Sequence, residues 1–197
     1  KGYVRIYQRD NSNTNVAPIG WTQLGSDIDG DENVDQSGWS LSLSSNGLII
    51  AIGAKLDDAI NNTKTDAGRV AVYEYINSSW SQIGSNIDGE NAGDQSGQCV
   101  SLSSDGSIVA IGSSKNNENG SNAGHARVYQ RDNSNTTVAP IGWTQLGSDI
   151  DGDASNKLGF SVSLSSNGDI LAIGALGFGS SHVRVYEYIN SGWSQIG

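Results

Sequence analysis

The residues best suited to chemistry in this chain of 197 residues are carboxylates gathered in three short, glycine-containing segments. Alternating aspartates around a glycine can offer several oxygen ligands, and Ca²⁺ binds about six to eight such oxygens. The alternative is structural, because Asp-Gly reverses the chain and carboxylates in turns accept backbone N–H groups. The sequence therefore predicts turns that could hold calcium. The candidate ligands are Asp27, Asp29, Asp31, Asp35, Asp88, Glu90, Asp94, Asp149, Asp151 and Asp153, with Glu32 beside the first group.

The third acidic segment departs from the other two. It has no counterpart of Asp35 and Asp94, and Lys157 lies nearby. A calcium site common to all three segments is therefore not expected.

Other reactive side chains are few, and their positions vary among copies of a repeat. His125 and His182 share a position that holds Tyr3 and Arg69 elsewhere, which predicts a place at a strand edge rather than a ligand or a base. Cys99 is the single cysteine, replaces a serine of other copies, and is predicted to be a small buried strand residue. Because no set of nucleophile, acid and base emerges, the sequence predicts that the chain is not an enzyme.

Short strands must position these groups. Apolar and small residues alternate with the period of a β-strand in Gly38–Gly47, Gly97–Gly106 and Gly159–Gly168. Each of these segments ends in Asn-Gly or Asp-Gly, a strong hairpin signal, and an apolar strand follows. A third strand of the type Gly-x-Val-x-Val-Tyr and a fourth that begins with tryptophan complete the unit.

The chain repeats this four-strand unit. The string TQLGSDIDGD at Thr22–Asp31 returns unchanged at Thr144–Asp153, and four strands per unit are typical of a β-propeller blade. We therefore expect an all-β fold of four-stranded antiparallel blades, about three and a half in this chain. The expected units are the second half of a blade in residues 1–25 and blades in 26–84, 85–147 and 148–197.

Residues that recur once per unit are expected to be structural. For the tryptophans, the alternative is a set of sugar-stacking platforms. Trp39 does not recur and is expected to fill a gap between blades. The expected structural residues are Gly38, Gly53, Gly97, Gly112, Gly159, Gly174, Trp21, Trp80, Trp143 and Trp193.

The motifs SGWSLSLSSNGLIIAIGA, LGFSVSLSSNGDILAIGA and AGRVAVYEY resemble the FG-GAP repeat family. That family forms the blades of integrin-α-type β-propellers and occurs in microbial and algal surface proteins. The resemblance implies extracellular recognition, adhesion or a structural surface role without catalysis. Integrin-type blades often carry a calcium loop between their first two strands. Here that hairpin is only SSNG or SSDG, so calcium is not expected at that place.

The sequence thus favours an extracellular or cell-surface structural and adhesive protein that is part of a longer chain or assembly. Its expected partners are itself or further repeats through blade edges, and other surface proteins or glycans. The alternative function is glycan binding through the variable loops Lys55–Ala67 and Ser114–Ala123. A net charge of −10 argues against nucleic acid, and the apolar runs are too short for membrane insertion. Possible N-glycosylation sites are Asn61, Asn77, Asn119 and Asn135.

Overall fold

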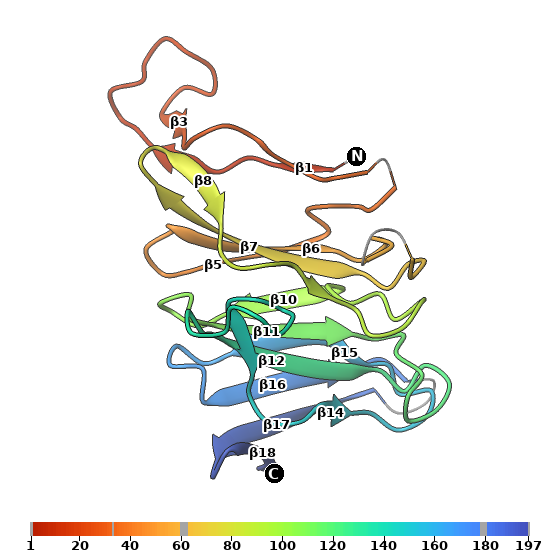
Figure 1. Cartoon of the computed structure of the whole chain (residues 1–197). Helices are drawn as coiled ribbons and strands as arrows, with labels where there is room; N and C mark the ends of the chain where they lie inside the picture. The colour runs from red at the N-terminus through yellow and green to blue at the C-terminus, as the bar shows by residue number, and fades with distance from the viewer. Residues whose placement is uncertain (1, 33, 60–62, 178–180, 197) are drawn as a thin grey trace.

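The computed structural model describes residues 2–32, 34–59, 63–177 and 181–196, and in these residues it contains strands and turns without helices (Figure 1). Antiparallel sheets follow one another from the N-terminal to the C-terminal end of the molecule. The predicted all-β, propeller-type fold is confirmed, whereas the number of blades and the unit boundaries stay predictions. None of the described residues belongs to a helix that could cross a bilayer.

Three sheets have four strands in chain order, and a short extra strand is added to two of them. The first contains β5 (Ser40–Leu43), β6 (Ile49–Ala54), β7 (Arg69–Ile76) and β8 (Ser79–Gln82), with β9 (Ile87–Asp88) paired to β7. The second contains β10 (Cys99–Leu102), β11 (Ile108–Ser113), β12 (His125–Arg131) and β13 (Trp143–Gln145), with β14 (Ile150–Asp151) paired to β12. The third contains β15 (Leu158–Leu164), β16 (Ile170–Ala175), β17 (His182–Ile189) and β18 (Gly192–Gln195).

Two short pairs precede these sheets. β1 (Tyr3–Val4) pairs with β4 (Ile28–Asp29), and β2 (Tyr7–Arg9) pairs with β3 (Trp21–Gln23). In the first two of these sheets, the third strand lies between the second strand on one side and the fourth and fifth on the other. β1 and β2 together are the counterpart of such a third strand, but among the described residues they have no neighbour on the side of the second strand.

Successive sheets contact each other through two different faces. On β5 and β10, serines point toward the following sheet, where the Ser42 hydroxyl accepts a hydrogen bond from the backbone N of Leu102 (2.9 Å) and the Ser101 hydroxyl from that of Leu164 (3.0 Å). The aliphatic residues that alternate with these serines face the preceding sheet, and Val100 and Leu102 join the core formed with β6 and β7. The alternation seen in the sequence therefore separates a hydroxyl face from an aliphatic face.

Glycines allow the sheets to approach closely. A Cβ atom on Gly53 would collide with the backbone of Gly97, and one on Gly112 would collide with the backbone of Gly159. Such contacts exclude any side chain at these positions unless the backbone moves.

The recurring tryptophans join each unit to the one before it. The indole N–H groups donate to backbone carbonyl oxygens of the preceding unit: Trp80 to Leu24 (2.8 Å), Trp143 to Ile83 (3.2 Å) and Trp193 to Leu146 (2.8 Å). The glycine that follows each acceptor, such as Gly84, lies against the indole ring.

The structure also tests what the sequence predicts for Trp39 and Cys99. The prediction that Trp39 fills a gap between blades is wrong, because its side chain is half exposed and its ring contacts the Lys55 ammonium, 3.1 Å from the ring centroid. Cys99 lies in β10, and its Sγ donates to the Gly159 carbonyl oxygen at 3.1 Å. Burial raises the pKa of this thiol to about 12, so it stays protonated at neutral pH.

Candidate functional site

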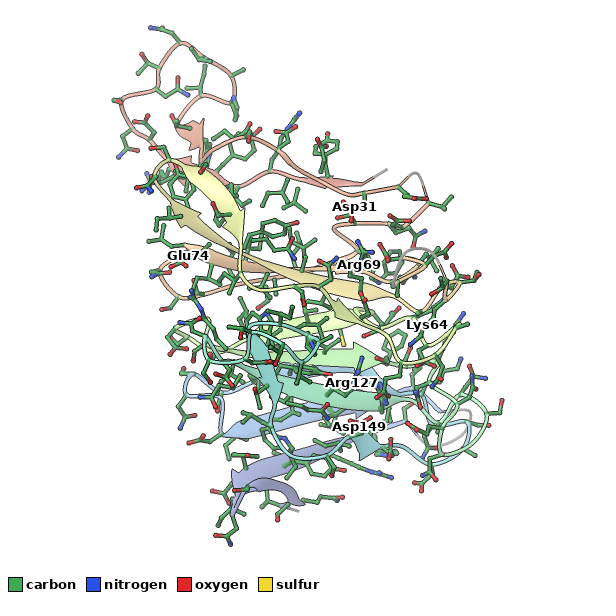
Figure 2. All side chains as sticks on the ribbon, viewed as in Figure 1. Asp31, Lys64, Arg69, Glu74, Arg127 and Asp149 are labelled. Carbon is green, nitrogen blue, oxygen red and sulfur yellow. The ribbon has the colours of Figure 1, made fainter. Side chains whose placement is uncertain are left out.

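The acidic turns lie beside the start of the third strand of each following sheet, and arginines on these strands reach back to them (Figure 2). Arg69 on β7 pairs with Asp31. Arg184 on β17 pairs with Asp153 at 2.7 Å. Ion pairs between these turns and the arginines therefore connect each unit to the next.

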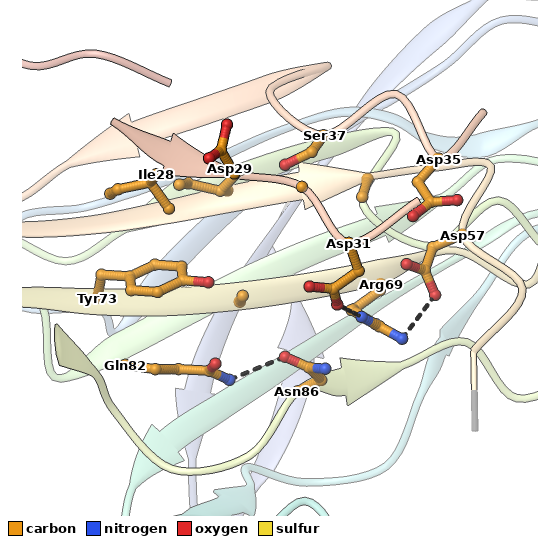
Figure 3. Close-up of a pocket in the computed structure, with 14 residues that line it drawn as sticks. Ile28, Asp29, Asp31, Asp35, Ser37, Asp57, Arg69, Tyr73, Gln82 and Asn86 are labelled. Atoms are coloured by element: carbon orange, nitrogen blue, oxygen red, sulfur yellow. Dashed lines mark hydrogen bonds and ion pairs between the residues drawn. The ribbon is translucent and has the colours of Figure 1, made fainter. Parts of the chain in front are cut away.

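Arg69 is the most highly connected of these arginines (Figure 3). Its guanidinium pairs with Asp31, with Asp57 at 3.0 Å and with Asp88 at 3.5 Å. Arg69, Asp31 and Asp57 border a cavity of about 50 Å³ between β4, β6 and β7. The Arg69 guanidinium forms ion pairs with three carboxylates, so the site resembles a structural ion-pair network.

Asp57 is the buried member of this network. Burial raises the pKa of its carboxyl to about 6, although the backbone N–H of Ala59 (2.8 Å) and Arg69 favour the ionised form. The folded chain therefore binds the Asp57 proton more tightly than the unfolded chain does. Through this group, stability rises as the pH falls from about 7 toward 4 and is lost as the pH rises through 6.

Asp57→Asn removes this titration and keeps an oxygen to accept the Ala59 N–H. We expect the melting temperature of the variant, relative to the parent, to be more favourable at about pH 7.5 than at about pH 4.5. Thermal unfolding at both pH values measures this difference. Asp31→Asn, which changes the exposed partner of the same Arg69, is the control for the loss of one ion pair and is measured at the same two pH values. Equal shifts for Asp57→Asn at both pH values would contradict the assignment.

Several other predicted calcium ligands form turns or pairs. Asp35 accepts the backbone N–H of Glu32 (2.8 Å), and Asp94 accepts that of Asn91 (2.9 Å). Each of these carboxylates thus closes its own turn, as the structural alternative predicts. Asp27 pairs with Arg5 at 2.8 Å, while Asp29 and Asp151 are exposed on β4 and β14.

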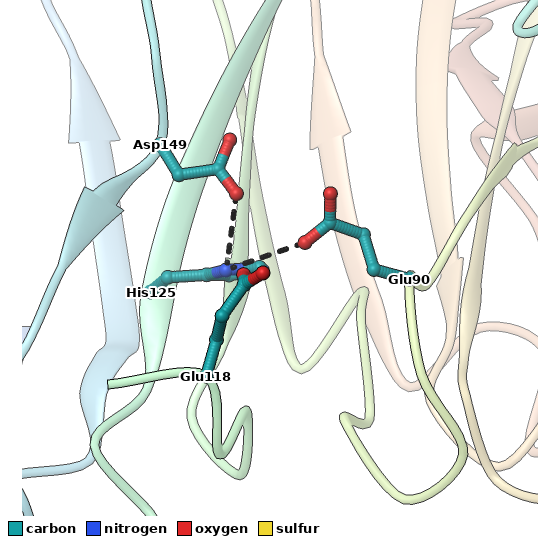
Figure 4. Close-up of side chains that lie close together, drawn as sticks. All are labelled: Glu90, Glu118, His125 and Asp149. Carbon is teal, nitrogen blue, oxygen red and sulfur yellow. Dashed lines mark ion pairs between the residues drawn. The ribbon is translucent and has the colours of Figure 1, made fainter. Parts of the chain in front are cut away.

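Two of the predicted ligands, Glu90 and Asp149, come together from different turns around His125 (Figure 4). Glu118 from the β11–β12 loop completes the cluster, and the potential ligand atoms all lie within 4.8 Å of one another. His125 Nδ1 is 3.5 Å from Asp149 Oδ2 and 3.8 Å from Glu90 Oε2. A group of side chains that could hold a metal ion is therefore present.

The histidine of this cluster is enclosed and uncharged. The His125 side chain is 0% exposed, and neither ring nitrogen has a hydrogen-bond partner in the described part of the chain. Burial, with the nearby Arg127 guanidinium, lowers the pKa of His125 to about 4. Burial also raises the pKa of Glu90, as do the neighbouring Asp149 and Glu118 carboxylates. At neutral pH the contacts with His125 are therefore not ion pairs, although the distances would allow them.

Sequence reasoning missed His125 and Glu118 as candidate ligands. Variation among copies at the His125 position predicts that it is not a ligand, and Glu118 lies in a loop that differs in every copy. His125 is the first residue of β12, and its side chain is buried. Variation of the residue type among copies did not predict this role, because each copy surrounds the position with different side chains.

An open groove of about 900 Å³ lies next to the cluster. Glu90 and Arg127 line one part of it, and the loop around Pro140 lines another. Trp143 borders the groove but is almost completely buried, so its ring face offers no sugar-stacking platform.

The possible glycosylation sites differ in their surroundings. Asn77 is exposed in the turn between β7 and β8. The side-chain amides of Asn119 and Asn135 donate to the carbonyl oxygens of Gly152 (2.8 Å) and Trp143 (2.7 Å). Asn61 lies outside the described residues, and use of any of these sites stays a prediction.

No family model and no curated protein matches this chain. Many solved structures resemble it, among them the following two. A Bacteroides uniformis protein named as a candidate 6-phosphogluconolactonase is 16% identical over 98% of this chain and 47% of its own, with a TM-score of 0.59. A Lactobacillus plantarum protein whose name states no function is 15% identical over 98% of this chain and 50% of its own, with a TM-score of 0.54.

The likeness is one of fold. These neighbours have β-propeller-like folds, and the chain spans about half the length of each. At such identities the name of an enzyme is not transferred. Because one neighbour carries such a name, the expectation that this chain is not an enzyme stays a prediction, as does the resemblance to FG-GAP repeats.

Proposed function

We propose that this chain is a non-catalytic, extracellular or cell-surface scaffold that associates with further strands of its own repeat type. The observation that carries the proposal is the exposed aliphatic face of β5. Leu41 and Leu43 on this face are 50% and 49% exposed, whereas their counterparts on β10, Val100 and Leu102, are 8% and 7% exposed. Equivalent residues are thus buried wherever a preceding sheet covers them, and their burial supplies a driving force for association.

The surroundings of Leu41 and Leu43 support strands of the same repeat type as the binding partner. A cavity of about 250 Å³ separates Val4, Ile6 and Tyr7 from Leu41 and Leu43. Among the residues that the structure describes, β1 and β2 lack the neighbour that β12 has in β11. A hairpin equivalent to β10 and β11 would supply both the missing hydrogen-bonding edge and the cover for the leucines. Another copy of this chain, or further repeats of a longer chain, could provide it.

The opposite end of the molecule is also open. Val183 on β17 and Phe160 on β15 are exposed, whereas Val70, the counterpart of Val183 on β7, is fully buried. The exposed serines of β15 belong to the hydroxyl face that inner sheets turn toward a following sheet. Both ends therefore offer surfaces that the inner units use for contact.

A graft tests the proposal. In the variant, a copy of residues 97–123 precedes Gly2, so that the strands equivalent to β10 and β11 lie ahead of β1. We expect the parent chain to self-associate at micromolar concentration, and the graft to lower the mass of the assembly and raise the melting temperature. Light scattering and thermal unfolding measure these changes.

The matched control carries the same graft with aspartates at the copied Val100 and Leu102, which should remove both effects. Leu41→Asp in the parent should also reduce the assembly mass, with little effect on the melting temperature because the side chain is half exposed. A monomeric parent whose stability does not respond to the graft would overturn the proposal.

Adhesion to other surface proteins is part of the same proposal and would use the surfaces that remain after this association. Glycan binding through Lys55–Ala67 and Ser114–Ala123 stays the alternative prediction, and so does calcium in the acidic turns. Binding of a glycan array that is lost on replacing either loop, but is kept in Leu41→Asp, would favour the alternative.

A further inference from the structure

Arg69 offsets the charge of nearby carboxylates in the first sheet, whereas the carboxylates at the equivalent place in the second sheet have no arginine at that position. His125 begins β12 as Arg69 begins β7, and both residues face an acidic turn of the preceding unit. Arg69 offers a permanent positive charge to three carboxylates. His125 offers an imidazole ring to Glu90, Glu118 and Asp149 instead.

Arg127 compensates for only part of this difference. Its Nη1 atom lies 3.6 Å from Glu90 Oε1, and its Nη2 atom donates to the Asp88 carbonyl oxygen at 2.9 Å. Three carboxylates therefore face one guanidinium and one imidazole. Like charges this close repel one another, and a bound dication would offset that repulsion.

Unsatisfied atoms point to the same place. The buried Oε2 of Glu90 and both ring nitrogens of His125 lack hydrogen-bond partners in the described part of the chain. An enclosed polar side chain normally finds a partner, because leaving a buried polar group unpaired is destabilising. A metal ion that binds one imidazole nitrogen and the carboxylate oxygens would satisfy that nitrogen and Glu90 Oε2 together.

We infer that Glu90, Glu118, His125 and Asp149 bind one divalent transition-metal ion, for which Zn²⁺ is the representative. Neutral imidazole and carboxylates are both good Zn²⁺ ligands, and four protein ligands match the usual coordination number of a structural zinc site. Ca²⁺ and Mg²⁺ prefer sites made of oxygen atoms alone, so the histidine favours a transition metal over both. This site differs from the predicted calcium turns, because it takes single residues from several segments.

The position of the ligands gives the ion a structural role. Glu90 belongs to the turn that follows β9 of the first sheet, whereas Glu118 and His125 belong to the second sheet and its loop. Asp149 lies just before β14. The ion would tie the first sheet to the second and would order the exposed loop that carries Glu118.

Metal binding to the purified, metal-free chain tests this inference. We expect calorimetric titration with Zn²⁺ to give one ion per chain, Zn²⁺ to raise the melting temperature, and Ca²⁺ to bind at least about tenfold more weakly. Co²⁺ should produce the visible absorption of a low-symmetry, four-coordinate site. His125→Gln and Glu118→Gln should each weaken Zn²⁺ binding at least about tenfold.

His182→Gln is the matched control, because His182 occupies the same repeat position in the third sheet and is not part of the cluster. It should leave Zn²⁺ affinity unchanged. Glu118 is exposed, so Glu118→Gln remains informative if His125→Gln fails to fold. Absence of Zn²⁺ binding, equal affinity for Ca²⁺, or Zn²⁺ affinity that survives Glu118→Gln would overturn the inference.

Discussion

Trp143→Ala is expected to lower the free energy of unfolding by about 3–5 kcal/mol, as is typical for a buried tryptophan. The side chain is 1% exposed, belongs to the core between the first and second sheets, and donates its indole N–H to the Ile83 carbonyl oxygen. Alanine would leave a cavity and an unpaired buried oxygen. Urea unfolding, monitored by circular dichroism, measures the loss as a lower midpoint.

Trp21→Ala is the matched control, because the residues from Ile19 to Asp31 repeat unchanged at Ile141–Asp153. Trp21 is 47% exposed, and within the described part of the chain no carbonyl oxygen accepts its indole N–H. We expect this variant to lower the free energy of unfolding by less than about 1 kcal/mol. Similar losses in the two variants would show that the indole contributes through its own unit rather than through contact between units.

Gly112→Ala is the second change with a large expected effect. The added methyl group would lie well inside contact distance of the Gly159 carbonyl oxygen and of the Cys99 sulfur. Since the obstacle is the backbone of the next sheet, β11 and β15 would have to separate. Overpacked sites typically lower the free energy of unfolding by about 1–3 kcal/mol, and we expect this variant to lower it by an amount at or above the upper end of that range. The same urea unfolding measures this change.

Gly174→Ala makes the same change at the equivalent position of the third sheet. There the added methyl group would meet the Ser161 side chain, whose hydroxyl can rotate, and no backbone of a following sheet. A much smaller loss is expected. If Gly174→Ala were as destabilising as Gly112→Ala, the close approach between sheets would not be the cause.

The strands could be predicted from the sequence because their causes are local. The alternation of Ser42 and Ser101 with aliphatic residues, and the Asn-Gly and Asp-Gly turns, lie within single segments and are repeated. Trp39 shows where this reasoning fails. A large aromatic residue in a strand predicts burial only if another sheet covers it, and that depends on the neighbour in space.

The candidate metal site depends even more on contacts between distant segments. Glu90 and Asp149 were recognised as acidic residues, but each was assigned to its own turn. Their proximity arises because β12 lies between the turn that follows β9 and the segment that precedes β14. Glu118 belongs to a loop without a repeated pattern, so comparison of copies carried no signal for it. The carboxylates could thus be named from sequence, but not their grouping.

The two unlike faces of each sheet give the stack a direction. On the first strand of a sheet, serine hydroxyls such as those of Ser42 and Ser101 point to the following sheet, and the aliphatic side chains that alternate with them point to the preceding one. Two copies that met through these surfaces would join head to tail, and a two-fold symmetric dimer would place like faces together. Head-to-tail contacts either close into a ring or continue as a helical filament, according to the rotation between neighbours. The curvature of the stack would then decide between a closed particle and a fibre.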